Sequence, residues 1–363
     1  MTGSEPGALW GDYTMGRDAV MDDMLLAAAR CVDEPLHLVI GDGFDQRTLH
    51  IVSRCLTLEI DFRVTTMALP SGVGHGDSSA LARSNREILA ELREQYGFAT
   101  HHVGEPKEAD SLTVGARQAR ALIADGILKV GEAVVLDVSA LPTRRFFPLI
   151  GAIEKQIRER CAGEFLVTVA ENPELDQMIR SEGTTEPGAI VGFRHALGTD
   201  AADVNTIWAP VLGESSSAEL RAIHEYLGPD EVYPILPFPA RDPRRADGLI
   251  LEHRELLFDV FETDKRNLLY VQEANPFDCY RVLTGLYLRS SDLLAPLGEV
   301  SVTTSVHASK MLSIGACLAS IEQPIAVVTA SGSHHLPEAP DDQWVRDTTD
   351  MTAIWLQGSP YRA

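Results

Sequence analysis

The chain has 363 residues, of which 45% are hydrophobic, so it can bury a sizeable core and exceeds the usual length of a single domain. Its formal charge of −22 at pH 7 argues against nonspecific nucleic-acid binding, because that binding depends on Lys and Arg neutralising phosphates. It contains no run of about 18 apolar residues, and residues 1–20 lack a basic segment followed by an apolar one. We therefore expect a soluble cytoplasmic protein with neither a membrane span nor a secretory signal.

Cysteine and histidine patterns do not predict a metal centre. The five cysteines form no close pair, and Cys55, Cys279 and Cys317 fall within amphipathic segments, which favours buried, reduced thiols. Neither CxxC nor HExxH occurs, and the pairs at 101–102 and 334–335 have no Cys or carboxylate at helical ligand spacing. We expect no metal site, and the sequence identifies no cofactor.

Apolar, β-branched runs alternate with helical periodicity from about residue 36 to residue 330, which is the pattern of βα units in a mostly parallel sheet. Nine runs are predicted as strands, at 35–41, 62–69, 133–139, 165–170, 205–212, 231–236, 267–273, 299–305 and 324–330. Nine strands are too many for one small domain. The sequence therefore predicts an α/β fold with two Rossmann-like, mostly parallel sheets that are flanked by helices and packed together.

The division between these two units is predicted in a polar, Gly-containing stretch at 180–203. It gives an N-terminal Rossmann-like domain at 1–190 and a C-terminal one at 191–363. Apolar residues in the tail at 344–358 need cover and are expected to cross between the units.

The two halves share a faint internal similarity. Residues 37–71 and residues 206–240 both read as strand, glycine turn, helix, strand and proline. Identity is too low to show duplication, and convergence on the βαβ pattern explains the similarity at least as well.

Two helix starts carry explicit capping signals. Ser216 with Glu219 three residues later forms a capping box, and Asn275 before Pro276 is an N-cap residue followed by a proline at the first helical position. Both follow a predicted strand, so their free N–H groups would face the carboxyl edge of the sheet.

The first predicted ligand-binding segment follows the strand at 35–41. Open parallel sheets bind ligands outside the carboxyl ends of their strands, and a strand, a Gly-x-Gly turn and a helix can form a backbone nest for an anion. A third glycine is absent, and the two acids in the turn suit ribose hydroxyls, a base edge or a metal better than a pyrophosphate. The predicted ligand-binding residues are Gly41, Asp42, Gly43, Asp45 and Arg47. The alternative is a tight turn in which Asp45 only caps a helix.

Two stretches are predicted as loops, and each is either functional or a simple surface connection. The stretch 69–79 (LPSGVGHGDSS) packs three glycines and a histidine, and it either closes over a ligand or is an exposed connection. It has no GK[ST] ending and is not a Walker A loop. The Pro- and Arg-rich stretch 237–248 is expected to be a surface loop, although its arginines also suit an acidic partner.

The segment 133–150 (AVVLDVSALPTRRFFPLI) is the most informative. Asp137 ends an apolar strand, and a buried carboxylate is costly unless it is paired. Arg144 and Arg145 stand at the next helix start, where two guanidinium groups call for an anion. That anion is either Asp137 or a ligand phosphate. We expect this cluster, with Ser139, at the carboxyl edge of the first sheet, and Asp137 is one candidate catalytic residue.

Three further strand ends complete the candidate set. Glu273 ends the strand at 267–273 without a helix dipole to explain it, so it is the preferred catalytic acid if a reaction occurs. Glu214 and Ser215 follow the strand at 205–212 and are predicted to bind ligand. Lys310, three residues after His307 at a helix start, is predicted to do the same.

Three functions remain open at this point. The first is a sensor or effector that binds a nucleotide or another phosphorylated small molecule at the carboxyl edge of one or both sheets. The second is a nucleoside or nucleotide hydrolase or transferase that uses Asp137 or Glu273. The third is an acidic interaction scaffold that binds a protein partner or a second copy of itself.

Overall fold

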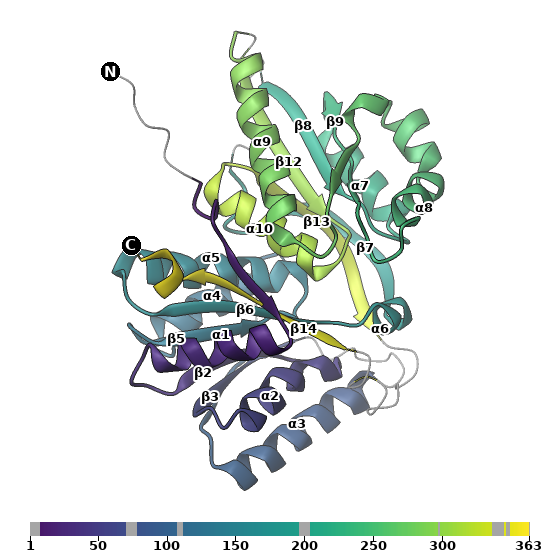
Figure 1. The fold of residues 1–363 in the computed structure, drawn as a ribbon. Coiled ribbons are helices and arrows are strands. Elements are labelled where there is room, and N and C mark those ends of the chain that lie inside the picture. Colours follow the sequence, from purple (N-terminus) through teal and green to yellow (C-terminus); the bar gives the residue numbers. More distant parts are fainter. Residues whose placement is uncertain are drawn as a thin grey trace, which may run out of the picture.

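The computed structural model describes residues 8–69, 78–106, 112–195, 204–296, 298–335, 345 and 349–362. In this part of the chain, two mostly parallel seven-stranded sheets are flanked by helices (Figure 1). This arrangement confirms the predicted α/β fold.

The first sheet has the order β1-β14-β6-β5-β2-β3-β4. Its strands are β1 (Thr14–Arg17), β2 (Leu36–Asp42), β3 (Phe62–Ala68), β4 (Thr100–Val103), β5 (Ala133–Asp137), β6 (Glu164–Glu171) and β14 (Asp350–Gln357). Strands β2 to β6 run parallel, whereas β14 is antiparallel to both β6 and β1. Its helices are α1 (Ala19–Arg30), α2 (His50–Thr57), α3 (Ser78–Tyr96), α4 (Val114–Ala124) and α5 (Thr143–Arg160), and a 3-10 turn at Gln46–Leu49 precedes α2.

The second sheet has the order β11-β10-β8-β12-β13-β7, and the short strand β9 also pairs with β8. Its strands are β7 (Arg180–Ala189), β8 (Val204–Val211), β9 (Glu231–Val232), β10 (Ile235–Pro237), β11 (Leu269–Val271), β12 (Glu299–Val306) and β13 (Ala326–His335). Strand β7 is antiparallel to β13, and the other pairs are parallel. The remaining helices are α6 (Pro173–Met178), α7 (Ser217–Leu227), α8 (Arg245–Glu252), α9 (Pro276–Leu294) and α10 (Lys310–Glu322), with short helical turns at Leu256–Val260, Lys265–Asn267 and Ser359–Tyr361.

The two sheets share one strand order. With the two-residue strand β9 left aside, the parallel strands of each sheet follow the spatial order third, second, first, fourth, fifth, which matches the first five strands of a Rossmann sheet. The similarity between 37–71 and 206–240 therefore has a structural basis, because β2–α2–β3 and β8–α7–β10 occupy matching places. In each half the topological switch point lies between the first strand and the fourth, which are β2 and β5 in one half and β8 and β12 in the other.

All nine predicted strands lie in observed ones, and 231–236 is split between β9 and β10. The stretch expected to separate the halves begins with β7, which pairs with β13 of the second sheet, while the tail strand β14 lies between β6 and β1 of the first. The division at residue 190 stays a prediction.

One predicted cap is present and the other is replaced. The side-chain oxygen of Asn275 accepts a hydrogen bond from the Phe277 N–H at 3.1 Å, as an N-cap does. Ser216 instead donates its hydroxyl to the Gly213 carbonyl at 2.8 Å, and Glu219 contacts His307. The capping box therefore gives way to contacts between the strand-end loops.

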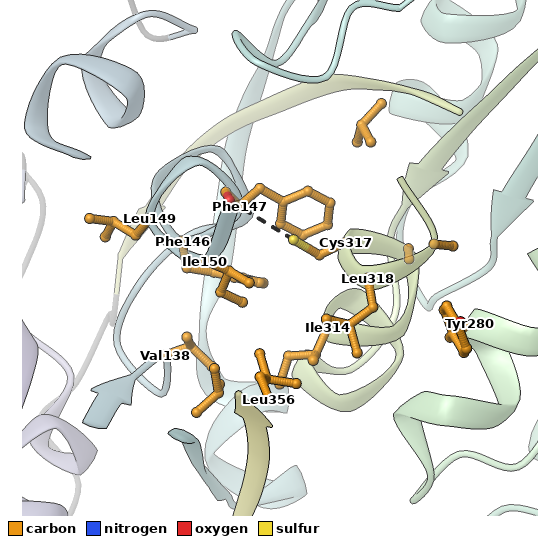
Figure 2. Close-up of a cluster of buried hydrophobic side chains, with 14 of the residues drawn as sticks. Val138, Phe146, Phe147, Leu149, Ile150, Tyr280, Ile314, Cys317, Leu318 and Leu356 are labelled. Atoms are coloured by element: carbon orange, nitrogen blue, oxygen red, sulfur yellow. Dashed lines mark hydrogen bonds between the residues drawn. The ribbon is translucent and has the colours of Figure 1, made fainter. Parts of the chain in front are cut away.

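The core continues from one half into the other through α5 and α10, which pack against each other (Figure 1). Figure 2 shows the junction, where Phe147 of α5 lies beside Cys317 of α10 and both are fully buried. The Cys317 thiol points at the Phe147 carbonyl, with sulfur and oxygen 3.9 Å apart. Because burial of large apolar side chains is the main source of stability, this junction holds the halves in one packed unit.

The carboxyl edges of the two sheets contact each other. Arg17, at the end of β1, donates to the carbonyl of Ala274 across the junction at 3.4 Å. Arg241 lies 4.0 Å from Asp350, which begins the antiparallel strand β14, and Lys310 donates to the Leu141 carbonyl. Residues near the carboxyl edges of both sheets therefore meet at the junction between the two halves.

Candidate functional site

The loop after β2 is shaped by close packing. A Cβ atom added at Gly41 would lie 3.2 Å from a Leu141 methyl group, and one at Gly43 would lie 2.9 Å from a Leu69 methyl group. A larger residue at either position would therefore push a leucine side chain of a neighbouring loop, and Asp42 lies between the two glycines.

Asp42 faces basic side chains from two other elements. Arg86 of α3 donates its Nε–H to Asp42 at 2.8 Å, and the Nδ1 atom of His102 on β4 lies 3.8 Å from the other carboxylate oxygen. His102 is also hydrogen-bonded to the Thr66 hydroxyl of β3 at 2.9 Å. Strands β2, β3 and β4 and helix α3 thus converge on one carboxylate.

A cavity of about 580 Å³ opens around this group, and we call it the α3 cavity. Its wall combines the carboxyl halves of β2, β3 and β4 with one face of α3. The lining residues are Ile40, Gly41, Asp42, Thr48, Leu49, Thr66, Ala68, Leu69, Asn85, Arg86, Leu89, Ala90, Arg93, Thr100, His101 and His102. Its size falls within the range of small-molecule sites, about 300–1,000 Å³.

The polar lining of the α3 cavity is mainly basic. Arg86, Arg93, His101 and His102 line the cavity together with the single carboxylate Asp42, and Arg93 donates to the Thr100 hydroxyl at 3.3 Å. The apolar part comes from Ile40 and the leucines of β3, α3 and the turn before α2. Such a wall can hold an anionic group and an apolar or aromatic body together.

A second group of predicted residues is buried at the switch point. Asp45 accepts hydrogen bonds from the Arg47 backbone N–H at 3.0 Å and from its guanidinium at 2.8 Å, and Asp176 of α6 contacts the same guanidinium at 2.8 Å. Burial raises the pKa of Asp45, but the charge of Arg47 and its hydrogen bonds together outweigh burial and hold the pKa below its ordinary value. Asp45 and Arg47 are therefore engaged with each other.

Asp137 is fully buried and bonded to hydroxyl groups. It accepts hydrogen bonds from the Ser139 N–H at 3.1 Å, the Ser139 hydroxyl at 3.0 Å and the Thr168 hydroxyl at 2.9 Å. Burial raises its pKa to about 7, against the effect of these three donors. The Ser139 hydroxyl in turn accepts from the Ala170 N–H at 2.8 Å, so Asp137 ties β5 to β6.

Lys310 reaches this region from the second half. Its ammonium donates to the Leu141 carbonyl and lies over the Phe146 ring, 5.3 Å from the centroid. Burial lowers its pKa to about 8, and the nearby charge of Arg47 adds to the effect. His307 diverges from it and bonds to Glu219 and Ser305, each at 3.1 Å. His307 and Lys310 therefore have different partners.

Arg145, in the first turn of α5, has partners other than Asp137. Its guanidinium donates to Glu105 at 2.8 Å and to Gln118 at 2.9 Å, while its buried Nε–H has no partner among the described residues. For Arg144, burial and the neighbouring charge of Arg145 lower the pKa. The acceptors of Asp137 are thus satisfied locally and Arg145 has its own acid.

The second-half candidates form a separate group. Arg245 of α8 donates to both carboxylate oxygens of Glu214 at 2.7 Å and is ion-paired with Glu273. The Ser215 N–H donates to Glu252 at 2.7 Å. The candidate catalytic residues Asp137 and Glu273 therefore lie on different sheets and have different partners.

The predicted residues thus do not form one site. Some line an open cavity, and others are engaged in hydrogen bonds and ion pairs with neighbouring side chains. Gly41 and Asp42 line the α3 cavity, whereas the other predicted residues are not among its lining. All residues of its lining belong to the first half, so the cavity does not lie between the two halves. The loop at 70–77 lies outside the described residues, as do the side chains at 334–335.

The sequence did not identify four of the cavity residues, namely Arg86, Arg93, His101 and His102. The two arginines lie in the middle of an amphipathic helix, where the pattern marks only an apolar stripe. The histidines lie on β4, a short polar strand that apolar runs do not reveal. Their pairing at 101–102 was a visible signal, but it was tested only as a metal motif.

The described residues contain no helix that is long and apolar enough to cross a membrane. They also contain no group of three or more His, Cys, Asp or Glu side chains able to hold a metal ion.

Comparison with known proteins gives structural neighbours only. No family model matches, and no curated protein matches in sequence. One similar solved structure is a type III CRISPR defence DNA nuclease activated by cyclic oligoadenylate, with a TM-score of 0.48 and 10% identity over 86% of this chain and 70% of that one. Another is a universal stress protein from Pseudomonas aeruginosa, with a TM-score of 0.22 and 13% identity over 83% of this chain and 94% of that one. Since these TM-scores lie below 0.5, the functional argument depends on the geometry of the site itself.

Proposed function

We propose that the α3 cavity binds a phosphorylated small molecule of nucleotide type and that the protein acts as a sensor or binding protein for it. The observation that carries this proposal is a 580 Å³ cavity beside the carboxyl ends of β2 and β3, whose wall holds four basic side chains and one carboxylate, with two of the basic groups against that carboxylate. Guanidinium groups recognise phosphate oxygens with charge-assisted hydrogen bonds, and a carboxylate can accept from two ribose hydroxyls.

The positions within the cavity suggest a role for each group. Arg86 and Arg93 lie two turns apart on one face of α3 and can contact phosphate oxygens. Asp42, held by Arg86, is placed to accept from the sugar, and the leucines of the wall can cover a base. We favour binding over catalysis because the Asp137 carboxylate accepts hydrogen bonds from Ser139 and Thr168 and does not line the cavity.

The test is binding of a nucleotide panel that includes AMP, ATP, cyclic AMP and linear and cyclic oligonucleotides. Thermal shift identifies a member that stabilises the full chain, and calorimetry then gives its affinity. Loss of one charge-assisted contact costs about 1.5–3 kcal/mol, so Arg86→Ala should weaken binding by roughly 10- to 100-fold.

The matched control is Arg83→Ala, which removes the same side chain from an exposed position of α3 that does not line the cavity. Its affinity should equal that of the unaltered chain. If no panel member stabilises the protein, or if both arginine variants weaken binding equally, the proposal fails.

A further inference from the structure

The second half repeats the start of the first-half site. Gly213, which follows β8, packs against the loop after β12 so closely that an added Cβ would overlap the His307 carbonyl. Gly41, near the end of β2, packs less tightly against the loop after β5, where an added Cβ would lie 3.2 Å from a Leu141 methyl group. Each glycine is followed by an acid, Asp42 in one half and Glu214 in the other. The two acids are counterparts in that both stand at the carboxyl end of the first strand of their half, Asp42 as the last residue of β2 and Glu214 three residues beyond the end of β8.

The counterpart acids also have counterpart arginines. Asp42 is paired with Arg86 on α3, the helix that follows the second strand β3. Glu214 is paired with Arg245 on α8, the helix that follows the second strand β10. The same acid–arginine pair thus stands at the carboxyl end of the first strand in both halves.

The two pairs differ in what the third strand adds. In the first half, β4 presents His102 to Asp42, and the Arg86 side chain is 52% exposed. In the second half, Glu273 follows β11, forms an ion pair with Arg245 and accepts from the Arg241 N–H at 2.9 Å. The Arg245 side chain is only 23% exposed, because carboxylates cover it from two sides.

We propose that Glu214 and Arg245 form a latent second site for a phosphate-bearing ligand, in which the Glu273 carboxylate occupies the place on Arg245 that a ligand phosphate takes on Arg86. This inference rests on the proposed function. A carboxylate and a phosphate compete for the same guanidinium donors, and an internal carboxylate has the advantage of being tethered. The unaltered chain therefore binds one ligand, in the α3 cavity.

The nearby charges are compatible with opening this site by one substitution. Asp242 is engaged by the Arg244 N–H at 2.9 Å, and Glu252 accepts from Ser215. Neutralising Glu273 leaves Arg245 with Glu214 alone, which is the arrangement of Arg86 with Asp42. The backbone N–H of Arg241 is then also free of a charged acceptor.

The experiment is calorimetric titration of the full chain and its variants with AMP and, separately, with inorganic pyrophosphate. We expect Glu273→Gln to add one binding event per chain to whatever the unaltered chain shows, and Glu273→Gln with Arg245→Ala to remove that event. Glu252→Gln is the control, because it neutralises a carboxylate of the same half without touching Arg245. Glu273→Ala serves as a second opening variant, and thermal unfolding checks that each variant is folded.

The latent site is tested by the difference in binding between variants and the unaltered chain. Its failure can therefore be distinguished from a failure of the proposed function. A failure of the α3 cavity shows as an absence of binding in the unaltered chain or as insensitivity to Arg86→Ala. The latent site is overturned if neither Glu273→Gln nor Glu273→Ala adds a binding event. It is also overturned if the added event survives Arg245→Ala or appears in Glu252→Gln.

Discussion

Replacement of Asp137 by Asn should change how the stability of the protein depends on pH. The folded carboxyl has a pKa of about 7 because it is buried, against an ordinary value of 3.8. Between these values the unfolded chain releases the proton and the folded chain keeps it, so rising pH favours unfolding. A pKa difference of one corresponds to about 1.4 kcal/mol, and the unaltered chain therefore loses about 4 kcal/mol of stability from this group between pH 4 and pH 7.

Asp137→Asn removes this loss but gives up a hydrogen bond. The amide oxygen of Asn can accept from the hydroxyls of Ser139 and Thr168 in place of Oδ2, but the amide nitrogen then cannot accept from the Ser139 N–H in place of Oδ1, which costs about 1–3 kcal/mol at every pH. The variant should be less stable than the unaltered chain near pH 4 and more stable above pH 7. Denaturant unfolding at several pH values measures the difference in the free energy of unfolding.

A companion variant acts in the opposite direction. Thr168→Val removes one donor that lowers the pKa of Asp137, so the pKa should rise further and the loss of stability should continue above pH 7. A constant difference between Asp137→Asn and the unaltered chain from pH 4 to pH 8 would refute the reasoning.

Two further predictions concern packing. Gly213→Ala should destabilise the chain by about 2 kcal/mol or more, since its Cβ would overlap the His307 carbonyl, whereas Gly248→Ala in α8 meets open space and should add about 0.5–1 kcal/mol; denaturant unfolding compares the two. Of the five cysteines, Cys31 and Cys161 are exposed, so a thiol reagent should label these two rapidly in the native protein and the remaining thiols only after denaturant is added, as counted by mass spectrometry. Fast labelling of a third thiol would contradict the buried core.

The fold could be predicted because its strands are buried on both faces. Continuous apolar runs such as 133–137 have no other stable environment, and all nine predicted strands are present. The strands that sequence reasoning missed are β1, β4, β7 and β14. The strands β1 and β4 have only four residues each, and β7 is mostly polar. Their pairing therefore depends on the neighbouring strands and not on an apolar run of their own. The strand β14 is apolar, but its place beside β6 depends on the chain returning from the second half.

The site was predictable only in part for the same reason. Strand-end reasoning found Asp42, because its position follows from the end of β2 alone. It did not find Arg86 or His102, because their approach to Asp42 depends on the register of β3 and β4 and on the rotation of α3 over the sheet. Spatial proximity of this kind leaves no spacing signal in the sequence.

The rule that ligands bind at the switch point also explains why the cavity lies one strand away from it. At the first-half switch point, Arg47 is held by Asp45 and Asp176, and the ammonium of Lys310 bonds to the Leu141 carbonyl. Breaking a buried ion pair by displacing one partner costs about 3–5 kcal/mol, so a ligand that entered there would first have to offset that loss. The carboxyl ends of β2, β3 and β4 carry no such cost, because the Arg86 side chain is half exposed and its pair with Asp42 lies on a cavity wall. The chain's own ions thus close the switch point and leave the α3 cavity as the open place on the same edge of the sheet.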